Sequence, residues 1–278
     1  NNKRICKHIL SAAQELQFTN HILLIDNDIY RSFYAKEFLK PRISIYYRRD
    51  NMTSAFWKKH APRLEPLLCS KSDLVATNSP QLAEAVKSYN SNCHDIGQGV
   101  DLESFRDGAS YLLPEDMKKI KRPIIGYMGT INSTRLDGEL LYQIISQRPD
   151  YSFVFTGPED DGFRQHRIHS LKNAYFTGQK KVDELPAYIT AYDVCINPQM
   201  VNDITDGNYP LKIDEYLAMG KPTVATSTHT MRHIFADHTH LATNPEEWLS
   251  AIDRAVTEAD DKELAKQRIA FAETHSWG

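Results

Sequence analysis

The stretch DGNYPLKIDEYLAMGKPTVAT, Asp206–Thr226, predicts a loop, a short helix and a buried strand in that order. Pro210 suits a first helical position, where a missing N–H costs nothing, and Gly220 suits the residue just past a helix end. Thr223–Thr226 is a run rich in β-branched residues, as in a parallel strand buried on both faces. The stretch therefore predicts one αβ unit of a parallel sheet.

The same helix could also bind a ligand. A helix that follows a glycine-containing loop presents N–H groups and a positive dipole end, which suit a phosphate. Ile213 and Leu217 lie four apart and can face a core, while Lys212 and Glu215 lie three apart and share another face. The Glu215 carboxylate could accept hydrogen bonds from sugar hydroxyls. A plain αβ unit with a solvated lysine and glutamate explains this segment equally well, so only the rest of the sequence can distinguish the two interpretations.

Length and composition set broad limits on the class of protein. The 278 residues suffice for a large core and most simply for two domains, and 33 basic against 36 acidic residues give a formal charge of -3. This charge predicts no general affinity for nucleic acid. The four cysteines stand far apart without a CxxC pair, so neither a zinc site nor a disulfide framework is indicated, and a reducing cytoplasm fits best. No apolar run is long enough for a membrane-spanning helix, which leaves peripheral contact with a membrane open.

Apolar strands alternate with polar helices along the whole chain, which predicts an α/β fold with parallel sheets. In the first part, the expected strands are His21–Ile25, Ile43–Tyr47, Leu74–Thr77 and His94–Ile96, and the expected helices are Ile29–Leu39, Ala61–Ser70 and Pro80–Ser88. In the second part, the expected strands are Ile124–Met128, Ser152–Phe155, Tyr175–Thr177, Val194–Asn197, Thr223–Thr226 and His240–Ala242, and the expected helices are Leu136–Ser146, Asp183–Ala191, Leu211–Met219 and Glu246–Glu258.

A charged, proline-containing stretch separates the two parts. We therefore predict a first domain over residues 1–105, a linker over 106–122 and a second domain over 123–278. The chain opens in a helix-like pattern rather than a strand, so the first domain is expected to be incomplete at its N-terminus. Ligands of such sheets bind at the carboxyl ends of the strands, so we expect a cleft between the two domains.

Two common phosphate-binding motifs are missing. No GxGxxG or GxxxxGK[ST] occurs, which disfavours dinucleotide-dependent enzymes and P-loop enzymes. The segment GYMGTINSTRLDGELL, residues 126–141, instead ends a strand at two glycines and enters a helix through a polar loop. Gly129 lets this loop approach a ligand closely, and Arg135 could pair with a phosphate, although a solvated surface arginine is the simpler reading of that residue alone.

Several segments in a fixed order resemble GT-B glycosyltransferases, particularly the large retaining family 4. In the second half, they are GYMGT at 126–130, FVFTGP at 153–158, YFTGQKKVDELPAYITAYDVCINP at 175–198 and YPLKIDEYLAMGKPTVAT at 209–226. In the first half, SKSDLVATNSPQLAEAV at 70–86 and IGQGVDLESF at 96–105 are similar to the family's last acceptor-domain segments. The resemblance implies two Rossmann-like domains that face each other across a cleft, with the nucleotide-sugar donor bound by the second.

The resemblance also implies roles for single residues. Glu215 matches the second Glu of the family's E-x7-E signature, which binds the ribose hydroxyls, and Arg135 falls where the family has a phosphate-binding Lys. The other donor-binding residues that it implies are Gly129, Thr130, Gly178, Lys180, Asp206, Gly207, Tyr209, Pro210, Leu211 and Lys212.

This chain departs from the family pattern at two places. Thr130 stands where the family has an Arg, which leaves one cation where two are usual, and Lys212 could compensate. The first Glu of the signature falls at Gly207, with Asp206 beside it as a substitute. The residues that would bind the transferred sugar are therefore less well defined than the residue that would bind the ribose.

The acceptor side carries fewer signals. Where related enzymes often have a His after a strand, this chain offers residues 26–28, Asp-Asn-Asp. Asp50 also follows a predicted strand, and we assign it and Arg135 as the catalytic candidates. Arg48 and Arg49 beside it could meet an anionic acceptor, but a surface position without a ligand is the preferred interpretation.

The sequence thus predicts an enzyme that transfers a sugar from a nucleotide diphosphate sugar to a glycan or lipid-linked acceptor, by a retaining mechanism and without a metal or other cofactor. We expect it to act in cell-surface polysaccharide biosynthesis, in the cytoplasm or at the inner face of the membrane. Two alternatives stay open. One is a nucleotide-sugar 2-epimerase with the same architecture, and the other is a non-catalytic partner subunit that binds nucleotide sugars.

Overall fold

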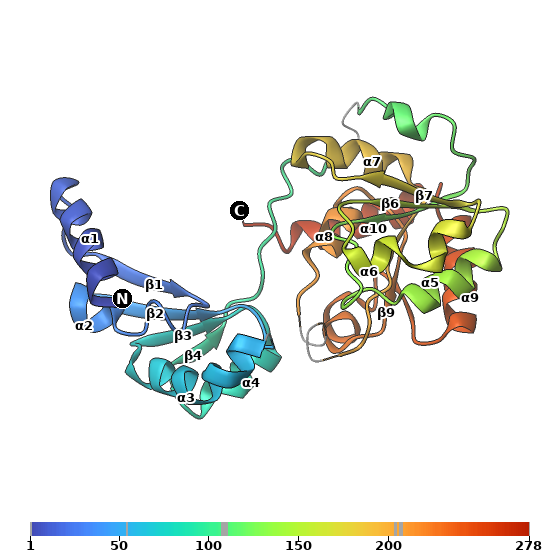
Figure 1. Cartoon of the computed structure of the whole chain (residues 1–278). Helices are drawn as coiled ribbons and strands as arrows, with labels where there is room; N and C mark the ends of the chain where they lie inside the picture. The colour runs from blue at the N-terminus through green and yellow to red at the C-terminus, as the bar shows by residue number, and fades with distance from the viewer. Residues whose placement is uncertain (1, 54, 107–110, 203–204, 206–207, 278) are drawn as a thin grey trace. The chain divides into compact units, whose positions relative to one another are not determined.

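The chain forms two compact units, each built around its own parallel sheet (Figure 1). The computed structural model describes residues 2–53, 55–106, 111–202, 205 and 208–277. The first unit comprises the described residues up to Gln98 together with Asn208 and Tyr209, and the second comprises the others. The predicted α/β class with parallel sheets is therefore confirmed.

The first unit contains a four-stranded sheet in the order β1-β2-β3-β4, with every pair parallel. Its strands are β1 (Ile22–Asp26), β2 (Ile43–Arg48), β3 (Leu74–Thr77) and β4 (Cys93–Asp95), and its helices are α1 (Asn2–Glu15), α2 (Ala35–Leu39), α3 (Ala55–Lys71) and α4 (Pro80–Lys87). Alternate side chains such as Tyr46 and Val75 leave one face of the sheet and pack against Leu68 and Val86 of the helices.

The helix expected over Ile29–Leu39 is shorter than predicted. The Asp28 carboxylate accepts hydrogen bonds from the backbone N–H groups of Tyr30 and Arg31, at 3.1 and 2.8 Å, and so closes a turn instead of a helix. Regular α2 begins only at Ala35. Local side-chain bonding by Asp28 thus replaced the first turns of the predicted helix.

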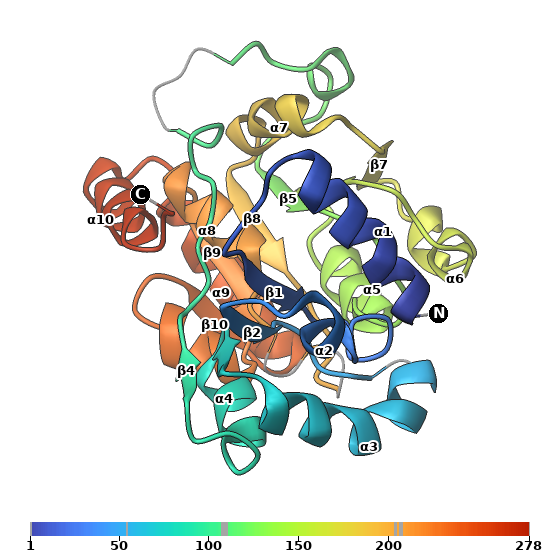
Figure 2. The same cartoon turned by 90° about the vertical axis from the view of Figure 1, so that its left-hand side faces the viewer.

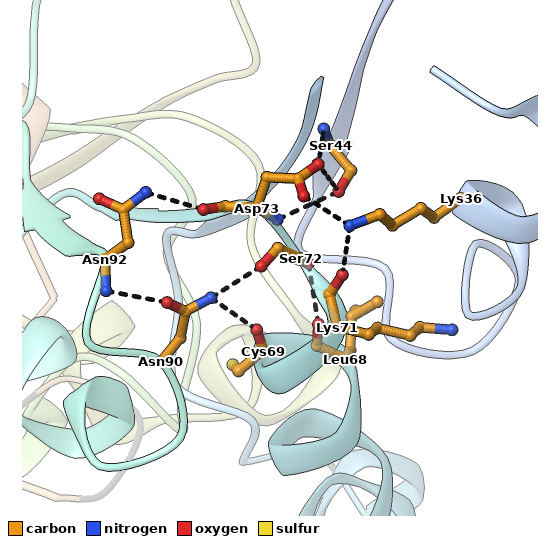
Figure 3. A network of polar contacts seen from close by, with 9 residues as sticks. All are labelled: Lys36, Ser44, Leu68, Cys69, Lys71, Ser72, Asp73, Asn90 and Asn92. Carbon is orange, nitrogen blue, oxygen red and sulfur yellow. Dashed lines mark hydrogen bonds and ion pairs between the residues drawn. The ribbon is translucent and has the colours of Figure 1, made fainter. Parts of the chain in front are cut away.

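A network of polar side chains joins the amino-terminal ends of β2 and β3 to the helices beside them (Figure 3). The Asp73 carboxylate accepts hydrogen bonds from the Ser44 N–H and hydroxyl, both at 2.8 Å, and from the Lys36 ammonium at 2.7 Å. Lys36 also donates to the carbonyl of Lys71 at 2.7 Å. The Asn90 amide extends the network to the carbonyls of Cys69 and Ser72.

The second unit contains a six-stranded parallel sheet in the order β10-β9-β8-β5-β6-β7. Its strands are β5 (Ile124–Met128), β6 (Ser152–Thr156), β7 (Ala174–Gly178), β8 (Val194–Asn197), β9 (Thr223–Thr226) and β10 (His240–Ala242). The chain adds strands on one side of β5, then returns to add β8, β9 and β10 on the other. This is the doubly wound order of a Rossmann-like fold, with a topological switch point between β5 and β8.

Helices cover both faces of this sheet (Figures 1 and 2). They are α5 (Gly138–Ser146), α6 (Asp161–Arg164), α7 (Leu185–Ala191), α8 (Leu211–Ala218), α9 (Pro245–Thr257) and α10 (Lys262–Glu273), with short turns η1 (Glu115–Met117), η2 (Arg167–Ser170), η3 (Val182–Glu184) and the π-helical η4 (Met231–Phe235). One face of the sheet packs against Ile144 of α5 and Trp248 of α9, both fully buried. Figure 1 shows α7 and α8 on the other side, and α10 packs on α8.

Part of the stretch between the sheets packs with the second unit. The Val100 N–H donates to the carbonyl of His275 at 2.9 Å, and Met117 is buried. Contacts therefore place residues 99–105, predicted as the end of the first domain, and residues 111–122 of the predicted linker in the second unit.

We predict that Asp73→Asn destabilises the first unit by about 1 to 2 kcal/mol, because a charge-assisted bond to Lys36 and bonds to nearly fully buried Ser44 are weakened. These contacts, the one to Lys36 first, lower the pKa of the Asp73 carboxyl from 3.8 to about 2, so this contribution is present at neutral pH and is lost as the pH falls toward about 2. Hydrogen exchange of β2 and β3 amides measures the effect, and β5 and β6 amides serve as the control. Unchanged exchange in β2 would contradict the assignment.

Candidate functional site

The predicted donor residues gather where the second sheet reverses its strand order. The loop that contains Gly129 and Arg135 leaves the carboxyl end of β5, and the chain that leads to α8 leaves the carboxyl end of the neighbouring strand β8. In open α/β sheets, this edge at the switch point is where ligands bind. The topology alone therefore brings together two segments that lie about 80 residues apart in the sequence.

Two glycines shape the loop after β5. Gly129 has a φ of 132° and Gly157, just after β6, has a φ of 148°, both in a region that side chains disfavour. A Cβ atom on Gly157 would lie 1.9 Å from the carbonyl oxygen of Gly129, so the two backbones can pass only without that side chain. The Gly129 N–H donates to the Thr156 carbonyl at 2.9 Å, and the chain then turns out of the sheet.

Further hydrogen bonds hold the loop in place. The Ile131 N–H donates to the Pro158 carbonyl at 2.8 Å, and the Met200 N–H donates to the Arg135 carbonyl at 2.8 Å. The Arg135 side chain is exposed, and its guanidinium makes no ion pair with any residue that the structure describes. The loop thus presents a cation on a backbone that is fixed at both ends.

Lys212 places a second positive charge directly over Gly129. Its ammonium donates to the Tyr127 hydroxyl at 2.7 Å and lies 4.1 Å from the centre of that ring. A Cβ atom on Gly129 would lie 2.7 Å from the Lys212 Nζ, so the absent side chain makes room for the ammonium. The Tyr127 hydroxyl in turn donates to the Thr130 carbonyl at 3.0 Å. The Tyr127 hydroxyl therefore links Lys212 to the backbone of Thr130.

The interior face of α8 fixes its position on the sheet. Ile213 and Leu217 are fully buried, which confirms that they face the core. The hydroxyl of the fully buried Tyr216 accepts a hydrogen bond from the Met128 N–H at 2.8 Å. Because α8 is anchored to the end of β5, Lys212 and Glu215 on its other side stand at the switch point.

Glu215 is half-buried, and its side-chain carboxyl group accepts no hydrogen bond from the residues that the structure describes. Burial raises the pKa of its carboxyl to about 7, against the opposing effect of the Lys212 ammonium and with a further rise from Asp214. The neighbouring Asp214 differs, since it is fully buried and its carboxylate lies 2.8 Å from the Nδ1 of His275. Glu215 is thus a poorly solvated carboxyl group whose oxygens are available to a ligand.

The start of α8 differs in detail from the prediction. Leu211 is the first helical residue and Pro210 is the residue before it, which makes no side-chain cap bond. Leu211 is exposed to 42% and so is accessible to a ligand. Tyr209 groups by its contacts with the first unit, and the predicted site residues Asp206 and Gly207 lie outside the described residues.

Gly178 ends β7 and Lys180 lies just after it, at the same edge of the sheet. Gly178 has a φ of 71°, and its carbonyl accepts a hydrogen bond from the Gly157 N–H at 3.0 Å. The Lys180 ammonium pairs with Asp116 at 2.8 Å, and Asp116 also accepts from the Tyr188 hydroxyl. The charge of Lys180 is therefore engaged within the protein.

Sequence reasoning missed three residues at this edge. Tyr127 lies inside the GYMGT motif, but only the structure shows that its hydroxyl contacts Lys212. Asn197 and Thr226 end the neighbouring strands β8 and β9, and the buried Asn197 Oδ1 and Thr226 Oγ1 have no hydrogen-bond partner in the described structure. The sequence signal that could have identified Asn197 and Thr226 is their position as polar residues at the ends of predicted strands.

The acceptor-side candidates belong to the first unit. Asp50 lies after β2 and is half-buried, and its assignment as a catalytic residue stays a prediction. The surface interpretation was wrong for Arg48, which is 7% exposed, lies 2.8 Å from Glu65 and donates to the Leu82 carbonyl. Its neighbour Arg49 is exposed, as expected, and pairs with Asp26 at 2.7 Å. The alternation of side chains along β2 turns Arg48 inward and Arg49 outward.

In the described part of the chain, no group of three or more His, Cys, Asp or Glu side chains could hold a metal ion. None of its helices is both long and apolar enough to cross a bilayer. A cavity of about 1030 Å³ in the second unit lies between Val100–Arg106, the end of α8 and α10, and none of the predicted donor residues lines it.

The order of the second sheet and the two loops at its switch point define a Rossmann-like unit, as found in the GT-B fold. Residues 122–258, just under half of the chain, match the family described as Glycosyl transferases group 1. The predicted resemblance to group 1 glycosyltransferases of GT-B fold is therefore confirmed.

Individual relatives agree with this class. The chain is 25% identical over 240 residues to TuaH of Bacillus subtilis (strain 168), which is named as a glycosyltransferase of teichuronic acid biosynthesis. That match covers 82% of this chain and 60% of TuaH, so the chain spans less than two thirds of this relative.

Solved structures show the same fold. HepE of Anabaena, in complex with UDP, superposes with a TM-score of 0.76 at 16% identity over 98% of this chain and 78% of its own. Sucrose-phosphate synthase of Thermosynechococcus elongatus gives a TM-score of 0.73 at 17% identity over 98% of this chain and 73% of its own. At these identities, the likeness establishes the fold alone.

We predict that Glu215 makes the second unit less stable as the pH rises. In the folded chain, its carboxyl keeps its proton up to about pH 7, whereas the unfolded chain releases it near 4.5, so the free energy of unfolding falls between these values, by an upper bound of about 3 kcal/mol. Urea unfolding of wild type and Glu215→Gln at several pH values measures this effect. The variant should lose that part of the pH dependence, and parallel curves for the two proteins would contradict the raised pKa.

Proposed function

We propose that this chain is a glycosyltransferase that takes a sugar from a nucleotide diphosphate sugar. The observation that carries the proposal is the switch-point site, where the Glu215 carboxyl group has no hydrogen-bond partner among the described residues and lies near the Lys212 ammonium, which stands over the glycine-shaped loop. A nucleotide diphosphate has hydroxyls for such a carboxylate and negative charge for the cations. If this segment were only a structural αβ unit, nothing would explain why an unpaired carboxyl group, a lysine and a glycine-shaped loop occur together.

The diphosphate would lie between the loop after β5 and the start of α8. Gly129 leaves the backbone accessible, the Lys212 ammonium stands over it, and the exposed Arg135 can swing toward a phosphate. The N-terminus of α8 adds a positive dipole end. Glu215, one turn into the same helix, would accept hydrogen bonds from the ribose hydroxyls. In this orientation, the ligand would contact the charged side chains of Lys212, Arg135 and Glu215.

The same cations can assist the chemistry. When the bond between the sugar and the diphosphate breaks, negative charge grows on the leaving phosphate, and Lys212, Arg135 and α8 lie where they can stabilise it. This is the reason that we propose transfer without a metal ion. In a retaining reaction, the leaving phosphate would also help to deprotonate the acceptor hydroxyl on the donor's own face.

The donor and acceptor are proposed from the relatives. HepE has been solved with UDP and with UDP-glucose, which makes UDP-sugars the first donors to test. TuaH is named for teichuronic acid biosynthesis, which supports an acceptor that is a growing cell-surface glycan, free or lipid-linked. Asp50 would lie on the acceptor side, and the reaction would take place in the cytoplasm, at or near the inner face of the membrane.

Glu215→Ala should weaken nucleotide affinity by about 1 to 3 kcal/mol, as expected when a hydrogen-bonding carboxylate is lost from a poorly solvated site. Calorimetric titration with UDP and UDP-glucose measures the change, with circular dichroism to confirm folding. Glu246→Ala is the matched control, because Glu246 is an exposed glutamate on α9 of the same unit. Equal affinities in all three folded proteins would refute the assignment of Glu215.

Lys212→Met should lower the turnover number for sugar transfer by about a hundredfold, with a smaller effect on donor affinity, because the lost charge acts mainly on the leaving phosphate. Transfer by the wild type should survive excess EDTA. Release of UDP in the presence of acceptor measures both effects, and the product's anomeric configuration tests retention. Strong inhibition by EDTA would exclude the metal-free mechanism. Epimerised donor without transfer would identify an epimerase, and binding without either reaction would identify a partner subunit.

A further inference from the structure

One side of α3 carries exposed apolar and basic side chains in a single stripe. Phe56, Lys59, Arg63 and Leu67 follow one another at spacings of three and four residues, which places them on one face of a helix. Lys59 and Arg63 are exposed, and Phe56 and Leu67 are exposed to 47% and 52%. We call these four residues, together with Tyr30, the α3 stripe. Large apolar side chains clustered on a surface mark a site of contact.

Tyr30 extends the stripe beyond the helix. Its ring is 50% exposed and meets the Phe56 ring edge to face, with centroids 5.5 Å apart, while His60 lies beside both rings. The Tyr30 carbonyl accepts a hydrogen bond from the Asn2 amide at the start of α1. The aromatic end of the stripe is therefore built from three segments of the first unit.

The charge around the stripe is positive. The helix from Ala55 to Leu64 contains three basic residues and no acidic one, and the next acidic residue, Glu65, is buried against Arg48. Residues 1–98 contain 14 basic and 9 acidic residues, a formal charge of +5, whereas residues 99–278 have a formal charge of -8. The chain thus concentrates its positive charge on the unit that also presents the stripe.

We propose that the α3 stripe docks the protein onto a lipid bilayer with anionic headgroups. Phe56 and Leu67, eleven residues apart, lie about 16 Å from each other along the helix, so both can enter the acyl boundary when α3 lies flat on the surface. Lys59 and Arg63 lie between them and meet phosphate headgroups, and Tyr30 suits the interface because its ring is apolar and its hydroxyl polar.

A soluble glycan fits this surface less well. Sugar rings stack on flat aromatic faces, but the rings of Tyr30 and Phe56 stand at 83° to each other. The stripe also contains no carboxylate or amide to bond sugar hydroxyls. Membrane docking goes beyond the proposed transferase activity, because it concerns the first unit and a different ligand.

Co-sedimentation tests the docking on the intact chain. The wild type should bind vesicles of equal parts phosphatidylcholine and phosphatidylglycerol, bind vesicles of phosphatidylcholine alone far more weakly, and be released by salt. The double variant Lys59→Glu/Arg63→Glu should lower partitioning by at least about tenfold. The matched control is Lys119→Glu/Lys121→Glu, which makes the same charge change at two exposed residues of the second unit and should stay within about twofold of the wild type.

The apolar part of the stripe needs its own variant. Phe56→Ser/Leu67→Ser should weaken vesicle binding by at least about fivefold, and circular dichroism should show an unchanged fold, because both side chains are exposed. Absence of binding by the wild type, or equal losses in the charge-reversal variant and its control, would overturn the proposal. So would retention on immobilised hyaluronan, lost in the charge-reversal variant, without vesicle binding, since that result would assign the stripe to an anionic glycan. Nucleotide affinity, measured in parallel, tests the transferase proposal independently.

Discussion

The candidate site depends on one close approach of two backbones. The Gly129 carbonyl lies where any side chain on Gly157 would collide with it, at 1.9 Å from a Cβ atom, and both glycines have a positive φ. This contact lets the chain after β5 turn across the end of β6. The missing side chain of Gly129 separately leaves room for the Lys212 ammonium, so the two glycines together shape the loop and admit the charge.

Around this point, the charged groups divide into structural and available ones. Lys180 and Asp214 have partners within the protein, Asp116 and His275 respectively. Among the described residues, the Lys212 ammonium bonds a neutral hydroxyl and lies over its ring without an ion pair, and the Glu215 carboxyl group has no hydrogen-bond partner. Leaving a carboxyl group poorly solvated and unpaired costs stability, which is common where a protein reserves a group for a ligand. The division distinguishes the site from the other polar clusters of the chain.

The polar side chains of the two units have different roles. In the first, Asp73, Arg48 and Glu65 are engaged by neighbouring side chains and serve the fold, and the α3 stripe is one of the exposed features of its surface. In the second, the available polar groups converge on one sheet edge. If the transferase and docking proposals both hold, the first unit brings the enzyme to the membrane where a lipid-linked acceptor resides, and the second supplies the activated sugar.

The sequence by itself determined most of the local elements and the resemblance to group 1 glycosyltransferases. Periodicity located Ile124–Met128, Val194–Asn197 and Thr223–Thr226 to the residue, since buried parallel strands are continuous apolar runs between turn residues. It placed Glu215 and Lys212 on one face of α8, apart from the core residues Ile213 and Leu217. Only the tertiary structure decided which groups are already paired, because pairing joins residues such as Tyr127 and Lys212 that lie 85 positions apart. Arg48 was misjudged because its buried partner Glu65 lies on another element, whereas the alternation along β2 was a signal that pointed inward. The Asp28 turn has a different cause, since a local bond from one side chain to the backbone replaced the predicted helix.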